Sequence, residues 1–204
     1  MRIAVLGIGN VGGALGKKWA AAGHEVVFGV REPDSPKVGV FLETVKGPAR
    51  AAALGESIAF GDVVLFAIPA GATAETVAAH GGMLNDKIVI DATNQFGAPV
   101  VNCIDVLAAR APRAHIYRAF NSLGWENFVK PYFGRIQADL LYCGPDGEPR
   151  LVMETLITDV GLRPVRVGDL DKVRLVDAVG EIWIALAFGQ NMGRRLAFKV
   201  LTEP

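Results

Sequence analysis

A glycine-rich turn near the start of the chain, Gly7-Ile8-Gly9-Asn10-Val11-Gly12, allows few folds. Its Gly-x-Gly-x-x-Gly spacing follows a short apolar segment, residues 2–6, and opens residues 10–22, where apolar side chains recur at helical spacing. In this strand–turn–helix context the pattern is typical of dinucleotide binding. We expect the first glycine to form a tight turn, the second to admit a pyrophosphate and the third to let helix and strand pack closely. The pyrophosphate would bind backbone N–H groups at the positive end of the helix.

The rest of the chain alternates short apolar runs with longer segments of helical pattern. This alternation predicts an α/β fold of the Rossmann type, with a doubly wound, mainly parallel sheet covered by helices on both faces. Prolines interrupt residues 32–60, where the elements are the least clear. We expect further strands over residues 25–30, 62–68, 87–91, 114–120, 138–143 and 163–167, with a helix ending at Gly161 before the last of them.

Composition excludes several classes of protein. The 204 residues include 21 Lys and Arg and 21 Asp and Glu, so the formal net charge is zero, which argues against a nucleic-acid binder. No run approaches the roughly 18 apolar residues of a membrane helix. Cys103 and Cys143 lack the spacing of a metal site or a disulfide framework, which indicates reduced thiols in a cytoplasmic protein. We therefore expect no nucleic acid, no membrane and no metal.

The end of the second predicted strand selects between dinucleotides. NAD sites usually carry an acid there that binds the ribose hydroxyls, whereas this chain has Val30 followed by Arg31, with Ser35 and Lys37 in the same loop. A guanidinium can pair with a 2′-phosphate, which favours NADP(H). Glu32 leaves NAD as the alternative, because its carboxylate could bind ribose hydroxyls instead. Residues 1–168 are accordingly predicted to form an NADP-binding Rossmann domain.

Ligands of parallel sheets bind beyond the carboxyl ends of the strands, so the residues at those ends are candidates. Ile68 and Pro69 offer an apolar wall for the cofactor, and Asn94 offers hydrogen bonds to it. Asn121 and Ser122 offer hydrogen bonds to the substrate. For each of the three polar residues, helix capping is the alternative role.

A general acid or base, which carbonyl reduction normally needs, is missing from the predicted strand ends. His24 and His115 precede strands, and His80 lies near the end of a helix. We therefore expect no catalytic acid or base, and hydride transfer by positioning alone. An acceptor that takes hydride without a proton from the protein, such as a flavin or deazaflavin ring, fits this absence.

The motifs together resemble a known family, the NADPH:8-hydroxy-5-deazaflavin oxidoreductases. The resemblance rests on residues 1–16, 27–31, 62–69, 88–94 and 119–121, and residues 193–199 are similar to the end of bacterial members. It implies that Gly7 to Gly12 form the pyrophosphate loop, that Arg31 binds the 2′-phosphate and that Ser35 or Lys37 supplies a second phosphate contact. Val30 and Ala70-Gly71 depart from the family, which commonly has Ser before the arginine and often Trp after the Ile-Pro pair.

The resemblance implies an NADP(H)-dependent oxidoreductase that transfers hydride between NADPH and a deazaflavin coenzyme. Residues 169–204 would form a small C-terminal helical extension, helical over 172–201 apart from an interruption near Gly189 or Gly193. Trp183, Phe188 and Met192 would form the acceptor wall, with core packing or a homodimer contact as the alternative. Two other functions remain open: reduction of a free flavin, quinone or ferric chelate, and non-catalytic redox sensing by an NADP(H)-binding protein.

Overall fold

The computed structural model describes residues 1–95 and 97–203. The chain divides into two compact units, residues 1–117 and 118–204, and each is described by itself. This division reflects the contacts within each unit and lies elsewhere than the predicted boundary after residue 168. That boundary stays a prediction about which part of the chain binds the cofactor.

A parallel sheet forms the centre of the first unit. Strand β1 pairs in parallel with β2 and β4, β2 with β3, and β4 with β5, and the hydrogen-bonded order is β6-β5-β4-β1-β2-β3. Side chains 3 to 6 of β1 are fully buried, as expected for a strand covered on both faces. The arrangement confirms the Rossmann-type α/β class. The strands are β1 (Arg2–Leu6), β2 (Glu25–Val30), β3 (Ala49–Ala53), β4 (Val63–Phe66), β5 (Ile88–Asp91) and β6 (His115–Arg118).

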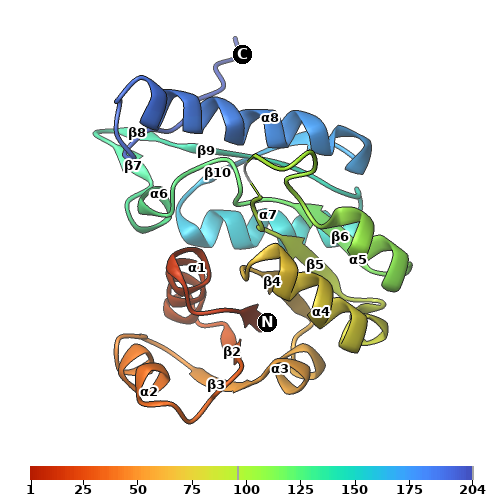
Figure 1. Ribbon diagram of the computed structural model, residues 1–204. Helices are drawn as coiled ribbons and strands as arrows, with labels where there is room; N and C mark the ends of the chain where they lie inside the picture. Colours follow the sequence, from red (N-terminus) through yellow and green to blue (C-terminus); the bar gives the residue numbers. More distant parts are fainter. Residues whose placement is uncertain (96, 204) are drawn as a thin grey trace. The chain divides into compact units, whose positions relative to one another are not determined.

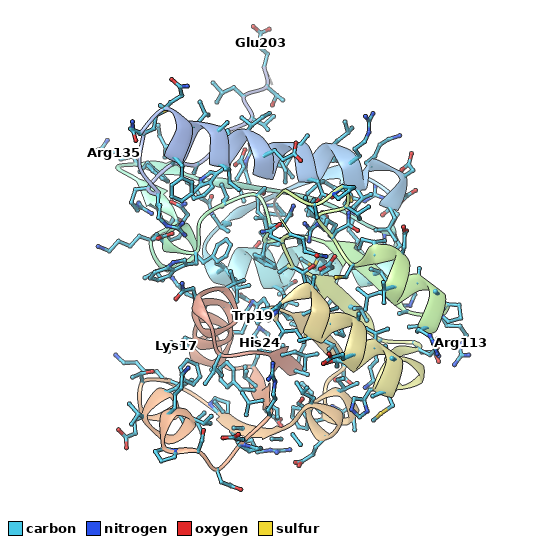
Figure 2. The ribbon with its side chains drawn as sticks, viewed as in Figure 1. Lys17, Trp19, His24, Arg113, Arg135 and Glu203 are labelled. Carbon is cyan, nitrogen blue, oxygen red and sulfur yellow. The ribbon has the colours of Figure 1, made fainter. Side chains whose placement is uncertain are left out.

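Helices cover both faces of these strands. In Figure 1, α1 and α2 lie on one side and α3, α4 and α5 on the other. Trp19 of α1 is fully buried, and Phe41 of α2 packs edge-on against Phe28 of β2 at a ring distance of 4.9 Å (Figure 2 labels Trp19). The helices are α1 (Asn10–Ala21), α2 (Pro36–Glu43), α3 (Leu54–Phe60), α4 (Ala70–His80), the 3-10 turn η1 (Gly81–Leu84) and α5 (Ile104–Arg110).

Residues 32–60, where the sequence pattern is weakest, contain α2, β3 and α3. Pro36 stands in the first turn of α2, where proline is favoured because its missing N–H has no partner to lose. The prolines of this segment therefore mark starts and ends of elements and do not exclude helices.

The second unit contains the parallel pair β9 and β10, and Arg118 at the end of β6 pairs with Cys143 in antiparallel register. Helix α7 ends at Gly161 in the left-handed conformation (φ 95°), as the sequence predicts. A hairpin of β7 and β8 was not expected. The elements are α6 (Glu126–Val129), β7 (Tyr132–Phe133), β8 (Ile136–Gln137), β9 (Asp139–Cys143), α7 (Glu148–Val160), β10 (Arg163–Gly168), η2 (Leu170–Lys172), α8 (Val173–Ile184) and the π-helical turn η3 (Ala185–Gly189).

The helix expected over residues 172–201 ends at Gly189, so the prediction is wrong for its last twelve residues. Asn191 and Gly193 adopt positive φ angles of 54° and 79°, which a right-handed helix does not accommodate. Residues 190–203, the C-terminal tail, have no regular secondary structure and are held by side chains of the second unit. Asn127 Nδ2 donates to the carbonyl oxygens of Arg194 and Leu196, at 3.2 and 3.1 Å.

Candidate functional site

The glycine loop leaves no space for side chains at two of its three glycines. Gly7 has φ 101°, and a Cβ atom there would lie 2.9 Å from the carbonyl oxygen of Ala67 and from Cγ2 of Ile68. A Cβ at Gly12 would lie 2.3 Å from the carbonyl oxygen of Gly7. The first glycine thus makes the turn and the third lets α1 pack against it, which are the two roles expected from the motif.

Gly9 is different, because nothing lies within 4 Å of a Cβ built on it. It is the N-cap residue of α1, and within the described structure no side chain caps the helix and no acidic residue stands in its first turn. The first N–H groups of α1 are therefore not capped by a side chain, and they stand beside the free space at Gly9, at the positive end of the helix dipole. This is the geometry in which a pyrophosphate binds a helix N-terminus.

Arg31 follows β2 directly and is exposed. The N–H group of Gly7 donates to the carbonyl oxygen of Gly29 at 2.9 Å, so the end of β2 lies beside the glycine loop. Ser35 is half-buried as the N-cap of α2, whereas Glu32 and Lys37 are exposed. Lys37 lies in the first turn of α2, so its predicted place in the loop is wrong. The loop itself carries the guanidinium of Arg31, the hydroxyl of Ser35 and two exposed carboxylates, those of Glu32 and Asp34.

The ends of β4 and β5 lie along the same edge of the first unit. A Cβ atom at Gly7 would collide with Ala67 and Ile68, so the glycine loop lies beside the end of β4. The N–H group of Ala92, after β5, donates to the carbonyl oxygen of Phe66 in β4 at 3.1 Å. Ile68 is half-buried, while Pro69 and Asn94 are exposed. The predicted cofactor residues Gly7, Ile8, Gly9, Asn10, Val11, Gly12, Arg31, Ser35, Lys37, Ile68, Pro69 and Asn94 therefore follow the carboxyl ends of four neighbouring strands.

The predicted substrate residues Asn121 and Ser122 belong to the second unit, in the turn after β6. Asn121 is 4% exposed and Ser122 1%, and the hydroxyl of Ser122 has no hydrogen-bond partner among the described residues. Phe120, just before them, has φ 60°, a strained conformation for a bulky side chain that costs about 1–3 kcal/mol. Such strain persists only where the surrounding structure holds it.

A buried ion pair, which sequence reasoning missed, holds this turn. Arg118 is fully buried, and its Nε donates to Oδ1 of Asp177 on α8 at 2.8 Å. The same Asp177 oxygen accepts a hydrogen bond from Nδ2 of Asn121 at 3.2 Å. A Cβ at Gly180, one turn further along α8, would lie 3.0 Å from the carbonyl oxygen of Asn121. Arg118 and Asp177 are 59 positions apart, so no local pattern predicts the pair.

The residues predicted as an acceptor wall differ in their exposure. Trp183 is 5% exposed, and its Nε1 donates to the carbonyl oxygen of Leu196 in the C-terminal tail at 2.8 Å. The guanidinium of Arg194 lies 5.5 Å from the ring centres of both Trp183 and Phe188. Phe188 and Met192 are more than half exposed. Of these residues, Phe188 and Met192 therefore present apolar surface, while Trp183 packs inside the second unit.

Three further features bear on the chemistry. His24, labelled in Figure 2, precedes β2 and lies 3.3 Å from the amino group of Met1, and His115 begins β6, so both stand at the amino ends of strands. Within the described part of the chain, no group of three or more His, Cys, Asp or Glu side chains could hold a metal ion. No helix in the described ranges is long and apolar enough to cross a membrane.

A cavity of about 180 Å³ in the first unit lies away from the glycine loop. Its walls include Glu25 and Ala49, the first residues of β2 and β3, so it opens at the amino ends of the strands. The ring of Phe60 in its lining already carries two guanidinium groups, those of Arg2 and Arg50, at 5.9 and 5.5 Å. We therefore assign this cavity no part in cofactor binding.

Comparison with known proteins identifies relatives of the same kind as the motifs indicate. Residues 2–95 match the family described as NADP oxidoreductase, coenzyme F420-dependent. The F420-dependent NADP reductase of Methanothermobacter thermautotrophicus is 25% identical over 225 residues, and the match covers 100% of this chain and 96% of the relative.

Solved structures extend the similarity of fold. A structure from Arthrobacter sp. FB24, described as a candidate F420-dependent NADP reductase, has a TM-score of 0.84 and 24% sequence identity, over 99% of this chain and 100% of the other. A reductive aminase from Aspergillus terreus in complex with NADPH and ethyl levulinate has a TM-score of 0.66 and 19% identity, over 93% of this chain and 61% of that one. The segment with the glycine loop and Arg31 thus matches the F420-dependent NADP oxidoreductase family, and the similarity to reductases of that name extends along the whole chain.

Proposed function

We propose that this protein is an NADP(H)-dependent oxidoreductase that transfers hydride between NADPH and the deazaflavin coenzyme F420. The observation that carries the proposal is the glycine loop, in which Gly7 and Gly12 are closed to side chains while Gly9 and the uncapped start of α1 face open space. The match of residues 2–95 to the F420-dependent family supports the choice of acceptor. Residues 193–199 favour the bacterial branch of that family.

NADP(H) is preferred to NAD(H) because Arg31 stands where the 2′-phosphate of the cofactor would lie. Its exposed guanidinium, at the end of a strand that pairs with β1, can form two parallel hydrogen bonds to a phosphate. Ser35, the N-cap of α2, and Lys37, in its first turn, would supply further contacts to this phosphate. Glu32 is exposed, so we assign its carboxylate to solvent.

In the proposed reaction, the role of the protein is to align the nicotinamide ring with the deazaflavin ring. NADPH would supply the hydride and a deazaflavin ring would accept it, with the one proton that balances the reaction taken from solvent and not from a side chain of the protein. The residues of this chain would hold the two rings in contact and exclude water, which can supply several kcal/mol of the rate enhancement. Ile68 and Pro69 would bound the nicotinamide side, and Asn121, Ser122, Trp183 and Met192 the acceptor side.

A second acceptor class follows from Ala70 and Gly71 at the start of α4. Nothing lies within 4 Å of a Cβ built at Gly71, which is exposed, so the position has room that a large side chain would fill. A free flavin, a quinone or a ferric chelate would suit a less restrictive pocket. We further propose that the protein is a homodimer, because Ile182, Phe188 and Met192, at and after the end of α8, are each more than half exposed. The free thiols of Cys103 and Cys143 favour a cytoplasmic location.

The test is a spectrophotometric assay with purified protein, NADPH and oxidised F420. We expect the deazaflavin absorbance to fall as NADPH is consumed, and NADH to be a much poorer donor. NADPH oxidation with free flavin but not with F420 would select the second acceptor class. Tight binding of NADPH without turnover on any acceptor would contradict an enzymatic role and favour a redox sensor.

A further inference from the structure

The carboxylate of Asp91, the last residue of β5, is fully buried and strongly hydrogen-bonded. Its Oδ1 accepts hydrogen bonds from the backbone N–H group of Thr93 at 2.9 Å and from the Thr93 hydroxyl at 2.7 Å. Its Oδ2 accepts from the backbone N–H group of Cys103 at 2.8 Å. Burying a carboxylate is costly unless donors replace the lost water, so these bonds fix the groups that make them.

The three bonds close a loop that carries a predicted cofactor residue. Thr93 stands at the beginning of this loop, and Cys103 stands at its end, just before α5. Between them, the N–H group of Gln95 donates to the carbonyl oxygen of Val101 at 3.0 Å. Exposed Asn94 thus lies between two residues whose backbones are fixed, Thr93 by Asp91 and Gln95 by Val101.

The order of the strands indicates which half of the cofactor Asn94 can reach. The order β2-β1-β4-β5 places Arg31, the glycine loop, Pro69 and Asn94 in sequence along one edge. With a 2′-phosphate at Arg31 and the pyrophosphate at the glycine loop, the nicotinamide half must extend toward the ends of β4 and β5. Asn94 therefore faces the nicotinamide half, and Arg31 the adenosine half.

We propose that Asp91 is a positioning residue, which does not touch the cofactor but holds Asn94 against the nicotinamide half of NADP(H). The inference rests on the proposed NADP(H) site. This role has a selective consequence. Loss of the hydrogen bonds of Asp91 to Thr93 and Cys103 should weaken the binding of ligands that contain the nicotinamide half, and should not affect the binding of ligands that contain only the adenosine half.

The experiment compares two ligands on the full chain, NADPH and adenosine 2′,5′-bisphosphate, by calorimetric titration. Asp91→Asn puts an NH2 group opposite a hydrogen-bond donor and so loses at least one of the three hydrogen bonds that Asp91 accepts. Thr93→Val replaces the hydroxyl with a methyl group, keeps the shape of the side chain and leaves the carboxylate of Asp91 in place. This variant keeps the test valid should Asp91→Asn fail to fold. Thr93→Ser restores a hydroxyl. The matched control is Thr76→Val in α4, where another buried threonine hydroxyl donates to a backbone carbonyl, that of Ala72.

We expect Asp91→Asn and Thr93→Val to raise the Kd for NADPH about tenfold or more, as the loss of a hydrogen bond to a charged group does. Their Kd for adenosine 2′,5′-bisphosphate should stay within about twofold of that of the unchanged protein, as should both constants of Thr93→Ser and Thr76→Val. Equal weakening of both ligands, or no change in either, would overturn the positioning role while leaving the NADP(H) site intact. Failure of the unchanged protein to bind either ligand would instead remove the proposed function and this inference with it.

Discussion

At the scale of single residues, the sequence predicts the roles that depend on neighbouring positions, but not those that depend on partners far along the chain. Gly7, Gly9 and Gly12 are recognisable because their roles depend on spacing within one turn, and the contacts of Gly7 and Gly12 agree with those roles. Asp91 also binds the nearby Thr93, but its bond to Cys103 and the bond of Asp177 to Arg118 span 12 and 59 positions, which no local pattern reveals. The partners of a buried aspartate therefore cannot be predicted from its place in the sequence.

Arg31→Ala tests the choice of dinucleotide. Loss of charge-assisted hydrogen bonds to a phosphate costs about 1.5–3 kcal/mol, so the Kd for NADPH should rise about 10- to 100-fold while that for NADH changes little. Equal losses for both would refute the 2′-phosphate assignment. Arg113→Ala is the control. This exposed arginine, labelled in Figure 2, pairs with Asp86 at 2.8 Å and precedes β6, so it lies at the amino end of a strand and not at the carboxyl ends where the cofactor would bind.

Gly9→Ala and Gly12→Ala should separate binding from folding. A methyl group at Gly9 meets no protein atom, so Gly9→Ala should leave the melting temperature unchanged and weaken NADPH binding about tenfold, where it meets the pyrophosphate. A methyl group at Gly12 collides with the carbonyl oxygen of Gly7, so Gly12→Ala should lower the free energy of unfolding by about 1–3 kcal/mol. Thermal unfolding and NADPH titration of both variants provide the check, and a Gly9→Ala protein that binds NADPH normally would contradict the site.

At the scale of elements, hydrophobic pattern and glycine signals predict the long, regular segments well. The strand before the glycine loop, α1 and the end of α7 at Gly161 agree with prediction. The two-strand hairpin β7–β8 and the end of the last helix do not, because short strands leave too few residues for a pattern and the C-terminal tail is shaped by distant partners. The tail has enough apolar residues to look helical, but side chains of other elements bind its backbone.

Asp139 at the start of β9 is a buried carboxylate whose lowered pKa links the stability of the protein to pH. It is fully buried, and burial opposes its ionisation, but hydrogen bonds from Arg163, Lys199 and the N–H group of Val200 outweigh this and lower its pKa. A pKa below the unfolded value of about 3.9 gives stability that is fully present above that value and is lost as pH falls through the folded pKa.

We therefore expect the free energy of unfolding to be level near neutral pH and to fall below about pH 4. Asp139→Asn should cost about 2 kcal/mol at pH 7, because hydrogen bonds to a charged group are lost, and should flatten the acid limb of the profile. Urea unfolding between pH 3 and pH 7 measures both effects. An unchanged acid limb in Asp139→Asn would assign the pH dependence to other carboxylates.

At the scale of the whole molecule, the fold class was the most secure part of the sequence interpretation. A regular alternation of strand and helix admits few topologies, and the glycine loop fixes which strand comes first. The two compact units have no such signal, because the boundary between them falls within β6, between Tyr117 and Arg118, where the sequence shows no linker.

Cofactor binding should be visible in the stability of the protein as a whole. NADPH at about 100 times its Kd should add about 2.7 kcal/mol to the free energy of unfolding, which raises the melting temperature of a chain of this size by about 5–10 °C. NADH at the same concentration should raise it much less. Differential scanning calorimetry makes the comparison, and equal shifts for the two dinucleotides would contradict the preference for NADP(H).

The C-terminal tail also bears on the order in which the two units fold. Its bonds to Asn127, to Asp139 and between Arg194 and Glu126 each join residues 60 to 69 positions apart. Closing loops of that length costs entropy before any contact repays it, and non-local contacts slow folding. The first unit builds β1, α1 and β2 from neighbouring segments, so it should acquire hydrogen-exchange protection first and the backbone around Asp139 last.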